Sequence, residues 1–189
     1  NTCAVIVEPI QGEGGVIVPP KGYLKAIRKI CTKHNVLMIA DEVQTGLART
    51  GKMFACQWEN VKPDAMILGK ALAGGMYPVS VFLATEEVMG VFKPGDHGST
   101  FGGNPLGAAI AQAALKVLVE EKLADRAHEI GEWFMGELRG IDSPHIKDVR
   151  GKGLLIGVEM KVSAGTARPY CEELANRGIL CKETHDQVV

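Results

Sequence analysis

The sequence predicts an α/β fold in which a mainly parallel sheet has helices on both faces, followed by the start of a smaller α+β domain. Three observations predict it. Short apolar runs recur in the first half of the chain, an amphipathic segment separates the first two runs, and the pattern changes after residue 140. A strand, a helix and a second strand in this order typically form a right-handed crossover in a parallel sheet. We therefore expect residues 1–140 to belong to a large domain and residues 141–189 to begin a smaller one.

The expected strands of the large domain are short and strongly apolar. The first occupies residues 3–7 and is closed by Glu8, Pro9 and a glycine-rich loop. Further strands are expected at residues 36–40, 65–68 and 79–84. Between the first two strands we expect an amphipathic helix, whose apolar stripe consists of Leu24, Ile27, Ile30 and Cys31.

The second half of the chain is predicted to be helical before it returns to strands. A helix is expected at residues 104–121, where many alanines make it narrow enough to pack deeply, and another at residues 123–138. After a turn at residues 142–144, a strand is expected at residues 154–160. A last helix should contain Tyr170, Leu174 and Ala175.

Composition and charge favour a folded protein with a small-molecule partner. Hydrophobic residues make up 46% of the chain and charged residues 23%, which is typical of a globular protein. The 21 basic and 22 acidic residues leave a formal net charge of −1, without a long run of one sign. A nucleic-acid groove or an anionic membrane surface as partner is therefore not indicated.

The two ends and the cysteines bear on where the protein works. The chain begins with Asn1, directly before an expected strand, and residues 186–189 resemble the start of another strand, so we expect a fragment of a longer protein. The five cysteines are scattered, without the C-x-x-C spacing of zinc or redox sites, and are expected to be reduced. We therefore expect an intracellular protein, cytoplasmic or, if a transit peptide has been lost upstream, of the mitochondrial matrix.

Polar residues follow the expected strands at the point where each one ends. In a parallel sheet, ligands bind outside the carboxyl ends of the strands. Glu8, Asp41, Gln44 and Lys70 come from three such ends and should meet at one edge. Each of them alone could simply face water, but their joint occurrence favours a binding site.

Lys70 is the strongest candidate for chemistry. It follows an apolar strand and precedes the small residues of segment 71–75. In apolar surroundings a lysine loses its charge more readily, and its neutral amine can attack a carbonyl carbon. Asp41 could keep the ring nitrogen of a pyridoxal cofactor protonated, while Gln44 could donate to the phenolic oxygen of the ring.

Three glycine-containing segments have features of a phosphate site. Residues 46–52 match the nucleotide-binding pattern G-x-x-x-x-G-K, but Met53 stands where a magnesium-binding hydroxyl is needed, so we reject this site. The glycines of segment 12–15 lack the spacing of a dinucleotide site. Residues 97–105 place two hydroxyls and several glycines just before a helix, which suits an anion, although a plain connection with a helix cap remains an alternative.

Taken together, these motifs closely resemble the class III aminotransferases of fold type I. The resemblance is based on residues 40–46 (ADEVQTG), 49–51 (RTG), 68–75 (LGKALAGG), 97–105 (HGSTFGGNP) and 150–154 (RGKGL), and it covers essentially the whole chain. It implies the PLP-transferase fold and pyridoxal 5'-phosphate as cofactor. By resemblance, Lys70 is the catalytic lysine that holds the cofactor as a Schiff base and shuttles the proton. Cofactor contacts are implied at the ring nitrogen for Asp41, at one ring face for Val43 and at the phenolic oxygen for Gln44.

The resemblance also implies contacts outside the ring. Ser99 and Thr100 should bind the cofactor phosphate of the other subunit, which makes the active unit a homodimer. Glu13 should gate the substrate by masking an arginine expected after Val189, and Glu8 should support the site. Because part of the pocket is expected outside these 189 residues, the chain alone should bind the cofactor poorly.

Within the family, the likeness is strongest to members that act on ornithine, on the basis of residues 69–72, 77–80 and 93–95. It implies transfer of the δ-amino group of ornithine to 2-oxoglutarate, giving glutamate 5-semialdehyde and glutamate, a reaction of arginine degradation and proline biosynthesis. Ala73 and Phe101 depart from the Ser and Tyr often found there, and Phe101 also suits enzymes that act on acetylornithine. The alternatives are acetylornithine or 4-aminobutyrate as substrate and, in another class, a non-catalytic fragment or binding module.

Overall fold

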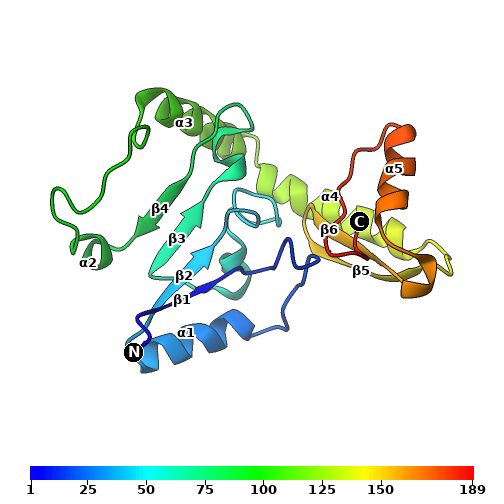
Figure 1. Cartoon of the computed structure of the whole chain (residues 1–189), viewed down its shortest axis with the longest axis horizontal. Helices are drawn as coiled ribbons and strands as arrows, with labels where there is room; N and C mark the ends of the chain where they lie inside the picture. The colour runs from blue at the N-terminus through cyan, green and yellow to red at the C-terminus, as the bar shows by residue number, and fades with distance from the viewer.

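The computed structural model describes all 189 residues and contains two separate sheets connected through long helices (Figure 1). The larger sheet has the strand order β1 (Ala4–Val7), β2 (Leu37–Asp41), β3 (Ala65–Leu68) and β4 (Val81–Ala84). The first three strands are parallel, and β4 runs antiparallel to β3. The prediction of a mainly parallel sheet is thus confirmed, with an antiparallel strand at its edge.

Four of the five α-helices agree with the predicted ones to within a few residues, whereas the short α2 (Glu86–Met89) was not predicted. The four are α1 (Tyr23–Lys33), α3 (Pro105–Glu120), α4 (Leu123–Arg139) and α5 (Arg168–Asn176). The start of α3 shows why these boundaries can be predicted: the Asn104 side chain accepts from the Gly107 amide, and Pro105 occupies the first turn. Three short 3-10 helices were not predicted: η1 (Ala55–Glu59), η2 (Lys70–Ala73) and η3 (Val162–Ala164).

The core lies on one face of the larger sheet. Leu24 and Cys31 of α1 pack on Met38 of β2. Leu68 of β3 packs with Leu72 and with residues of α3. Because Phe54 and Met66 contact both clusters, the core is continuous beneath α1 and α3.

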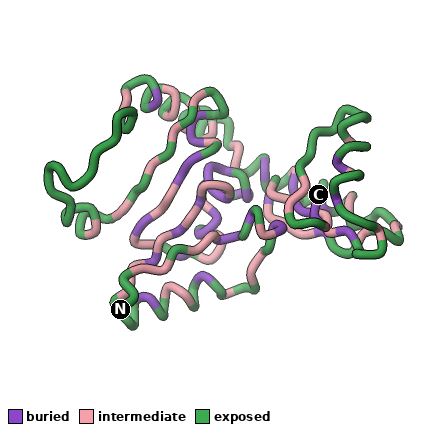
Figure 2. Tube along the Cα trace, viewed as in Figure 1, coloured by how far each residue is buried: buried purple, intermediate pink, exposed green.

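The other face of this sheet is open within these residues. Ile6 is 61% exposed and Phe82 42% exposed, and the register places both on the face opposite Met38. The helices of this chain thus cover one face, where helices on both were expected. The prediction that α3 packs deeply is wrong for this chain: Gly107 is its only buried residue, and Figure 2 shows most of its length as exposed or intermediate.

The second sheet is an antiparallel hairpin of β5 (Ile146–Lys152) and β6 (Leu155–Met160). Strand β6 was expected, whereas β5 was not. The end of the chain pairs with β6 through two backbone hydrogen bonds between Val158 and Val189, of 2.9 and 3.0 Å. The strand expected to start at residue 186 is not formed, because residues 185–187 make a turn between isolated bridges. This sheet begins after residue 140, but the domain boundary there stays a prediction. No helix is both long and apolar enough to cross a membrane.

Candidate functional site

Asp41 and Lys70 come from neighbouring parallel strands and lie at the same edge of the sheet. Asp41 is the last residue of β2 and is aligned with Ile67 of β3, three residues before Lys70. Gly69 extends the chain by one residue, and Lys70 then begins η2 with φ of 43°. This left-handed conformation is uncommon for a side-chain-bearing residue and often marks functional sites.

Lys70 lines a cavity of about 970 Å³ between the turn after β2, η2 and helices α3 and α4. Of its 23 lining residues, 16 are hydrophobic, so the cavity is mainly apolar. The side chain of Lys70 itself is exposed. The apolar surroundings expected for this lysine are therefore found on the cavity walls but do not enclose the amine within these residues.

Val43 and Gln44 line the same cavity. The Val43 amide donates to Asp41 Oδ1 at 3.1 Å, which fixes the start of the turn, and Val43 lies beside Gly69. The Gln44 side chain lies against Gly12, where a Cβ atom would come within 2.7 Å of it. The half-buried Asp41 is beside this turn but is not among the residues that line the cavity.

Glu13 and Glu8 both belong to the loop that follows β1. The Glu8 carboxylate accepts from the Gly12 amide at 2.9 Å, and thus fastens the loop. Glu13 forms an ion pair with Lys182 at 3.0 Å. Lys182 lowers the pKa of the Glu13 carboxyl, and the charge of Lys70 and a hydrogen bond with Gln44 lower it further. The positive charge of Lys70 thus also favours the ionised form of Glu13.

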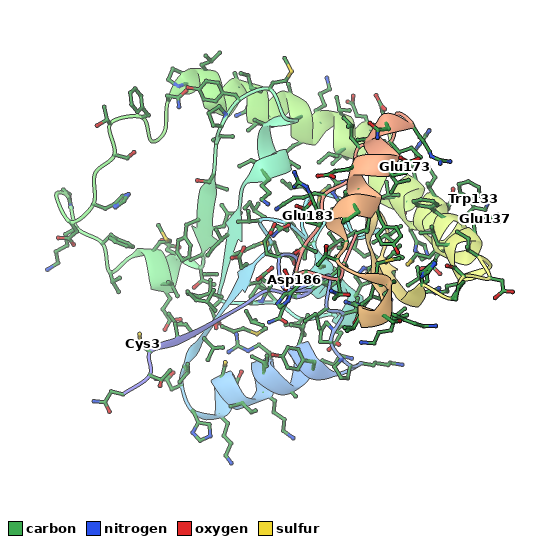
Figure 3. All side chains as sticks on the ribbon, turned by 45° about the vertical axis from the view of Figure 1, so that its right-hand side comes forward. Cys3, Trp133, Glu137, Glu173, Glu183 and Asp186 are labelled. Carbon is green, nitrogen blue, oxygen red and sulfur yellow. The ribbon has the colours of Figure 1, made fainter.

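The C-terminal segment provides the other side of this loop. Figure 3, in which Glu183 and Asp186 are labelled, shows the segment running from α5 back toward the larger sheet. The Thr184 hydroxyl donates to the Glu13 carbonyl at 2.6 Å. Arg150 of β5 donates to the Gly15 carbonyl at 2.7 Å. The loop that carries Glu13 is therefore held by the smaller sheet and the chain end.

Ser99 and Thr100 lie away from Lys70, in a long exposed connection between α2 and α3. Ser99 Oγ accepts from the Gly102 amide at 2.9 Å and lines a second cavity of about 790 Å³ with Tyr77. Lys70 is not among the residues that line this second cavity. The structure thus does not bring these hydroxyls to the Lys70 cavity of the same chain, and their role in phosphate binding stays a prediction.

Glu42 is a residue of the site region to which the sequence analysis gave no role. It follows Asp41 but is fully buried, and it accepts hydrogen bonds from Thr45, Ala55 and Cys56. One signal could have revealed it: side chains alternate along an extended chain, so a carboxylate beside Asp41 must point to the opposite side.

The groups at this sheet edge fit the chemistry of pyridoxal 5'-phosphate. Lys70 offers an amine for an aldehyde, Asp41 a carboxylate for a protonated ring nitrogen, and Gln44 an amide for a phenolic oxygen. Val43 offers an apolar surface for a ring. No group of three or more His, Cys, Asp or Glu residues could hold a metal ion.

Comparison with protein families gives one match over the full chain. The family described as "Aminotransferase class-III" matches residues 1–189. Ornithine aminotransferase 2 of Staphylococcus saprophyticus is 60% identical over 189 residues, which are 100% of this chain and 47% of that relative. Ornithine aminotransferase 2 of Staphylococcus aureus is 62% identical with the same coverage. The chain thus spans about half the length of the curated relatives it matches.

Solved structures agree with these relatives. Ornithine aminotransferase from Plasmodium yoelii superposes with a TM-score of 0.95 at 51% identity, over 98% of this chain and 50% of that one. Acetylornithine aminotransferase from Elizabethkingia anophelis gives a TM-score of 0.92 at 52% identity, over 98% and 49%. One structure of the Toxoplasma gondii ornithine aminotransferase, with a TM-score of 0.95 at 49% identity over 98% and 44%, is described with pyridoxal phosphate at its active site.

Proposed function

Because this chain belongs to the class-III aminotransferase family, we propose that it carries the lysine-bearing part of a pyridoxal-phosphate-dependent ornithine aminotransferase. The proposed reaction moves the δ-amino group of ornithine to 2-oxoglutarate and yields glutamate 5-semialdehyde and glutamate. One observation carries the proposal: Lys70, Val43 and Gln44 line a single, mainly apolar cavity, at the sheet edge where β2 ends with Asp41.

Each residue at this edge has a chemical task in the proposed enzyme. Pyridoxal 5'-phosphate, when bound, supplies an electron-withdrawing ring that stabilises negative charge on a substrate carbon. Lys70 holds the cofactor covalently and, as a free amine, moves a proton to and from that carbon. Asp41 favours the protonated ring nitrogen by its charge. Val43 packs on a ring face, and Gln44 donates to the phenolic oxygen.

Ser99 and Thr100 are proposed to bind the cofactor phosphate of a second subunit in a homodimer. Their position supports this, because both lie in an exposed segment away from the Lys70 cavity of their own chain. Glu13 is proposed to gate the substrate. The charge of Lys70 lowers the pKa of its carboxyl, and Lys182 of the C-terminal segment forms an ion pair with it. Glu8 is proposed to support the site through its bond to Gly12.

Acetylornithine is the second candidate substrate. The comparison with the acetylornithine enzyme of Elizabethkingia anophelis, at 52% identity, favours it specifically. The relatives named for ornithine are closer, at 60% and 62% identity, so ornithine is preferred. The staphylococcal relatives also favour cytoplasmic over mitochondrial localisation for the proposed enzyme.

The test is borohydride trapping in the full-length enzyme followed by peptide mapping. We expect one reduced cofactor adduct, on Lys70, and its loss in Lys70→Ala, while Lys62→Ala, a change of an exposed loop lysine, keeps it. Assays with ornithine, acetylornithine and 4-aminobutyrate as donors then identify the substrate. An adduct on another lysine, or equal activity of Lys70→Ala, would refute the proposal.

A further inference from the structure

Glu42 is a buried negative charge without a cationic partner. Its side chain is 0% exposed, and it takes part in none of the ion pairs of the structure. Oε2 accepts from the Thr45 hydroxyl at 2.5 Å and the Ala55 amide at 3.0 Å, and Oε1 accepts from the Cys56 amide at 2.9 Å. A carboxylate is stable in such a place only where donors replace water, so these three groups hold it.

The carboxylate of Glu42 faces away from the cavity of Lys70. β2 ends at Asp41, and the chain turns from Val43 onward, with the Glu42 side chain directed inward to Ala55 and Cys56. Consistent with this, Val43 lines the cavity and Glu42 does not. Glu42 therefore has no route to a ligand in that cavity and can act only through its neighbours.

Those neighbours form the turn that carries two of the proposed cofactor contacts. The Gly46 amide donates to the Glu42 carbonyl at 2.9 Å, and a Cβ at Gly46 would come within 2.8 Å of that oxygen. The turn 42–46 is thus closed by the backbone of Glu42, while the side chain of Glu42 ties it to Ala55 and Cys56. Val43 and Gln44 lie in the middle of this turn.

We propose that Glu42 is a positioning residue for the cofactor site: its buried carboxylate ties segment 45–56 to the end of β2 and thereby orients Val43 and Gln44 beside Lys70. The inference rests on the proposed function for the identity of the ligand. The tie itself is a property of this chain and can be measured without any ligand.

Cys56 provides a reporter for the tie. Its thiol is buried, and burial, together with the negative charge of Glu42, raises its pKa to about 12. Because the thiolate is the reactive form, Cys56 should be nearly inert while the segment is closed. Loss of the Glu42 charge lowers the pKa of Cys56 and also releases the segment. Both effects increase the reactivity of the Cys56 thiol.

The experiment compares Glu42→Gln with the parent full-length enzyme, first free of cofactor. We expect Cys56 to react with iodoacetamide about tenfold faster or more in the variant, measured on the Cys56 peptide by mass spectrometry. After addition of pyridoxal 5'-phosphate, we expect weaker retention and a shifted absorbance maximum. Thr45→Val removes one of the three bonds and should change both readouts in the same direction, but less.

Asp64→Asn is the matched control, because Asp64 stabilises the opposite end of β2. Its Oδ2 accepts from the Met38 amide at 2.7 Å, and it pairs with Arg28. The control should lower the melting temperature while leaving cofactor absorbance and retention unchanged. Equal shifts of the cofactor readouts in Asp64→Asn would reduce Glu42 to a general structural residue and overturn the proposal.

The outcomes separate this inference from the proposed function. Unchanged Cys56 reactivity in both Glu42→Gln and Thr45→Val would overturn the tie, even if Lys70 is trapped by borohydride. Faster Cys56 reaction with no cofactor adduct on Lys70 of the parent enzyme would support the tie but refute the cofactor site. If Glu42→Gln does not accumulate as folded protein, Thr45→Val decides the result alone.

Discussion

The charges around Lys70 are arranged by single residues from distant parts of the chain. Glu13 follows β1, whereas its partner Lys182 is 169 positions away in the C-terminal segment. Both side chains are well exposed, so their ion pair contributes little to stability. Its effect is electrostatic, because the charges of Lys182 and Lys70 both lower the pKa of the Glu13 carboxyl.

Lys182→Met is expected to raise the pKa of Glu13 back toward its ordinary value of 4.5. The sign follows from the cause, since a neighbouring cation favours the ionised carboxylate and its removal favours the protonated form. Any stabilisation from the pair is present above pH 4.5 and is lost as the pH falls through the lowered pKa. A carbon-13 NMR titration of the Glu13 carboxyl measures this directly.

The control for this titration is Lys161→Met, which removes an exposed lysine that forms no ion pair with Glu13. The Glu13 titration should be unchanged in the control. A pKa of Glu13 that stays at its parent value in Lys182→Met would show that the ion pair does not set it.

At the scale of elements, α4 is attached to the smaller sheet by a close backbone approach. Gly131 of α4 faces Gly153 in the β5–β6 turn, and a Cβ at Gly131 would collide with the Gly153 carbonyl. Gly136 lies on the same helix, with nothing within 4 Å of a Cβ at that position. The two glycines thus differ in packing and not in secondary structure.

Gly131→Ala is expected to destabilise the protein by about 3 kcal/mol, since the backbone of the turn must move to accept the methyl group. Gly136→Ala should stabilise it by about 0.5–1 kcal/mol, because alanine is the better helix former. Urea denaturation of both variants gives the comparison. Equal effects of the two changes would mean that α4 does not depend on this contact.

Elements with a strong local pattern were predictable, and those without one were not. Strand β3 was predicted with its observed bounds, because four apolar residues lie between Asp64 and Gly69. Strand β5 was missed, since its sequence IKDVRGK has no apolar run and its pairing with β6 defines it. The direction of β4 also depends on its partner strand, which a local pattern does not reveal.

At the scale of the whole molecule, large apolar surfaces remain exposed. Leu106 and Val117 of α3 are exposed, as are Ile6 and Phe82 on the open face of the larger sheet. Trp133, labelled in Figure 3, is exposed on α4. Surfaces of this kind are typical of protein that is covered by further chain or by another subunit.

The proposed homodimer predicts complementation between two inactive variants. Lys70→Ala and the double variant Ser99→Ala/Thr100→Ala should each have little activity. After the subunits are mixed and exchanged, heterodimers contain one site with both the lysine and the hydroxyls intact. About a quarter of parental activity should return if subunits pair at random, as measured by steady-state assay.

No recovery in mixed subunits that demonstrably exchange would contradict phosphate binding across the interface. In that case the lysine and the hydroxyls of one site would come from the same chain, and every heterodimer site would lack one of them. Native mass spectrometry of a mixture in which one variant carries a mass tag is the control for exchange itself, because it detects the mixed dimers directly.

The isolated 189-residue chain is expected to bind pyridoxal 5'-phosphate poorly. Lys70 is exposed, and the Ser99 and Thr100 hydroxyls do not line its cavity, so cofactor contacts within one copy are few. The measurement is the absorbance of the dialysed chain in the visible band of the bound cofactor. A retained yellow colour would contradict the expectation.

The sequence by itself determined most strands and helices, and the placement of Lys70 and Asp41 at strand ends, because apolar runs and the polar residues after them are local properties. Only the tertiary structure decided the antiparallel direction of β4, the pairing of Glu13 with Lys182, the burial of Glu42 and the separation of Ser99 from the Lys70 cavity. Each of these depends on contacts between segments far apart in the chain. Such contacts are set by how the whole molecule packs, which no short stretch of sequence specifies.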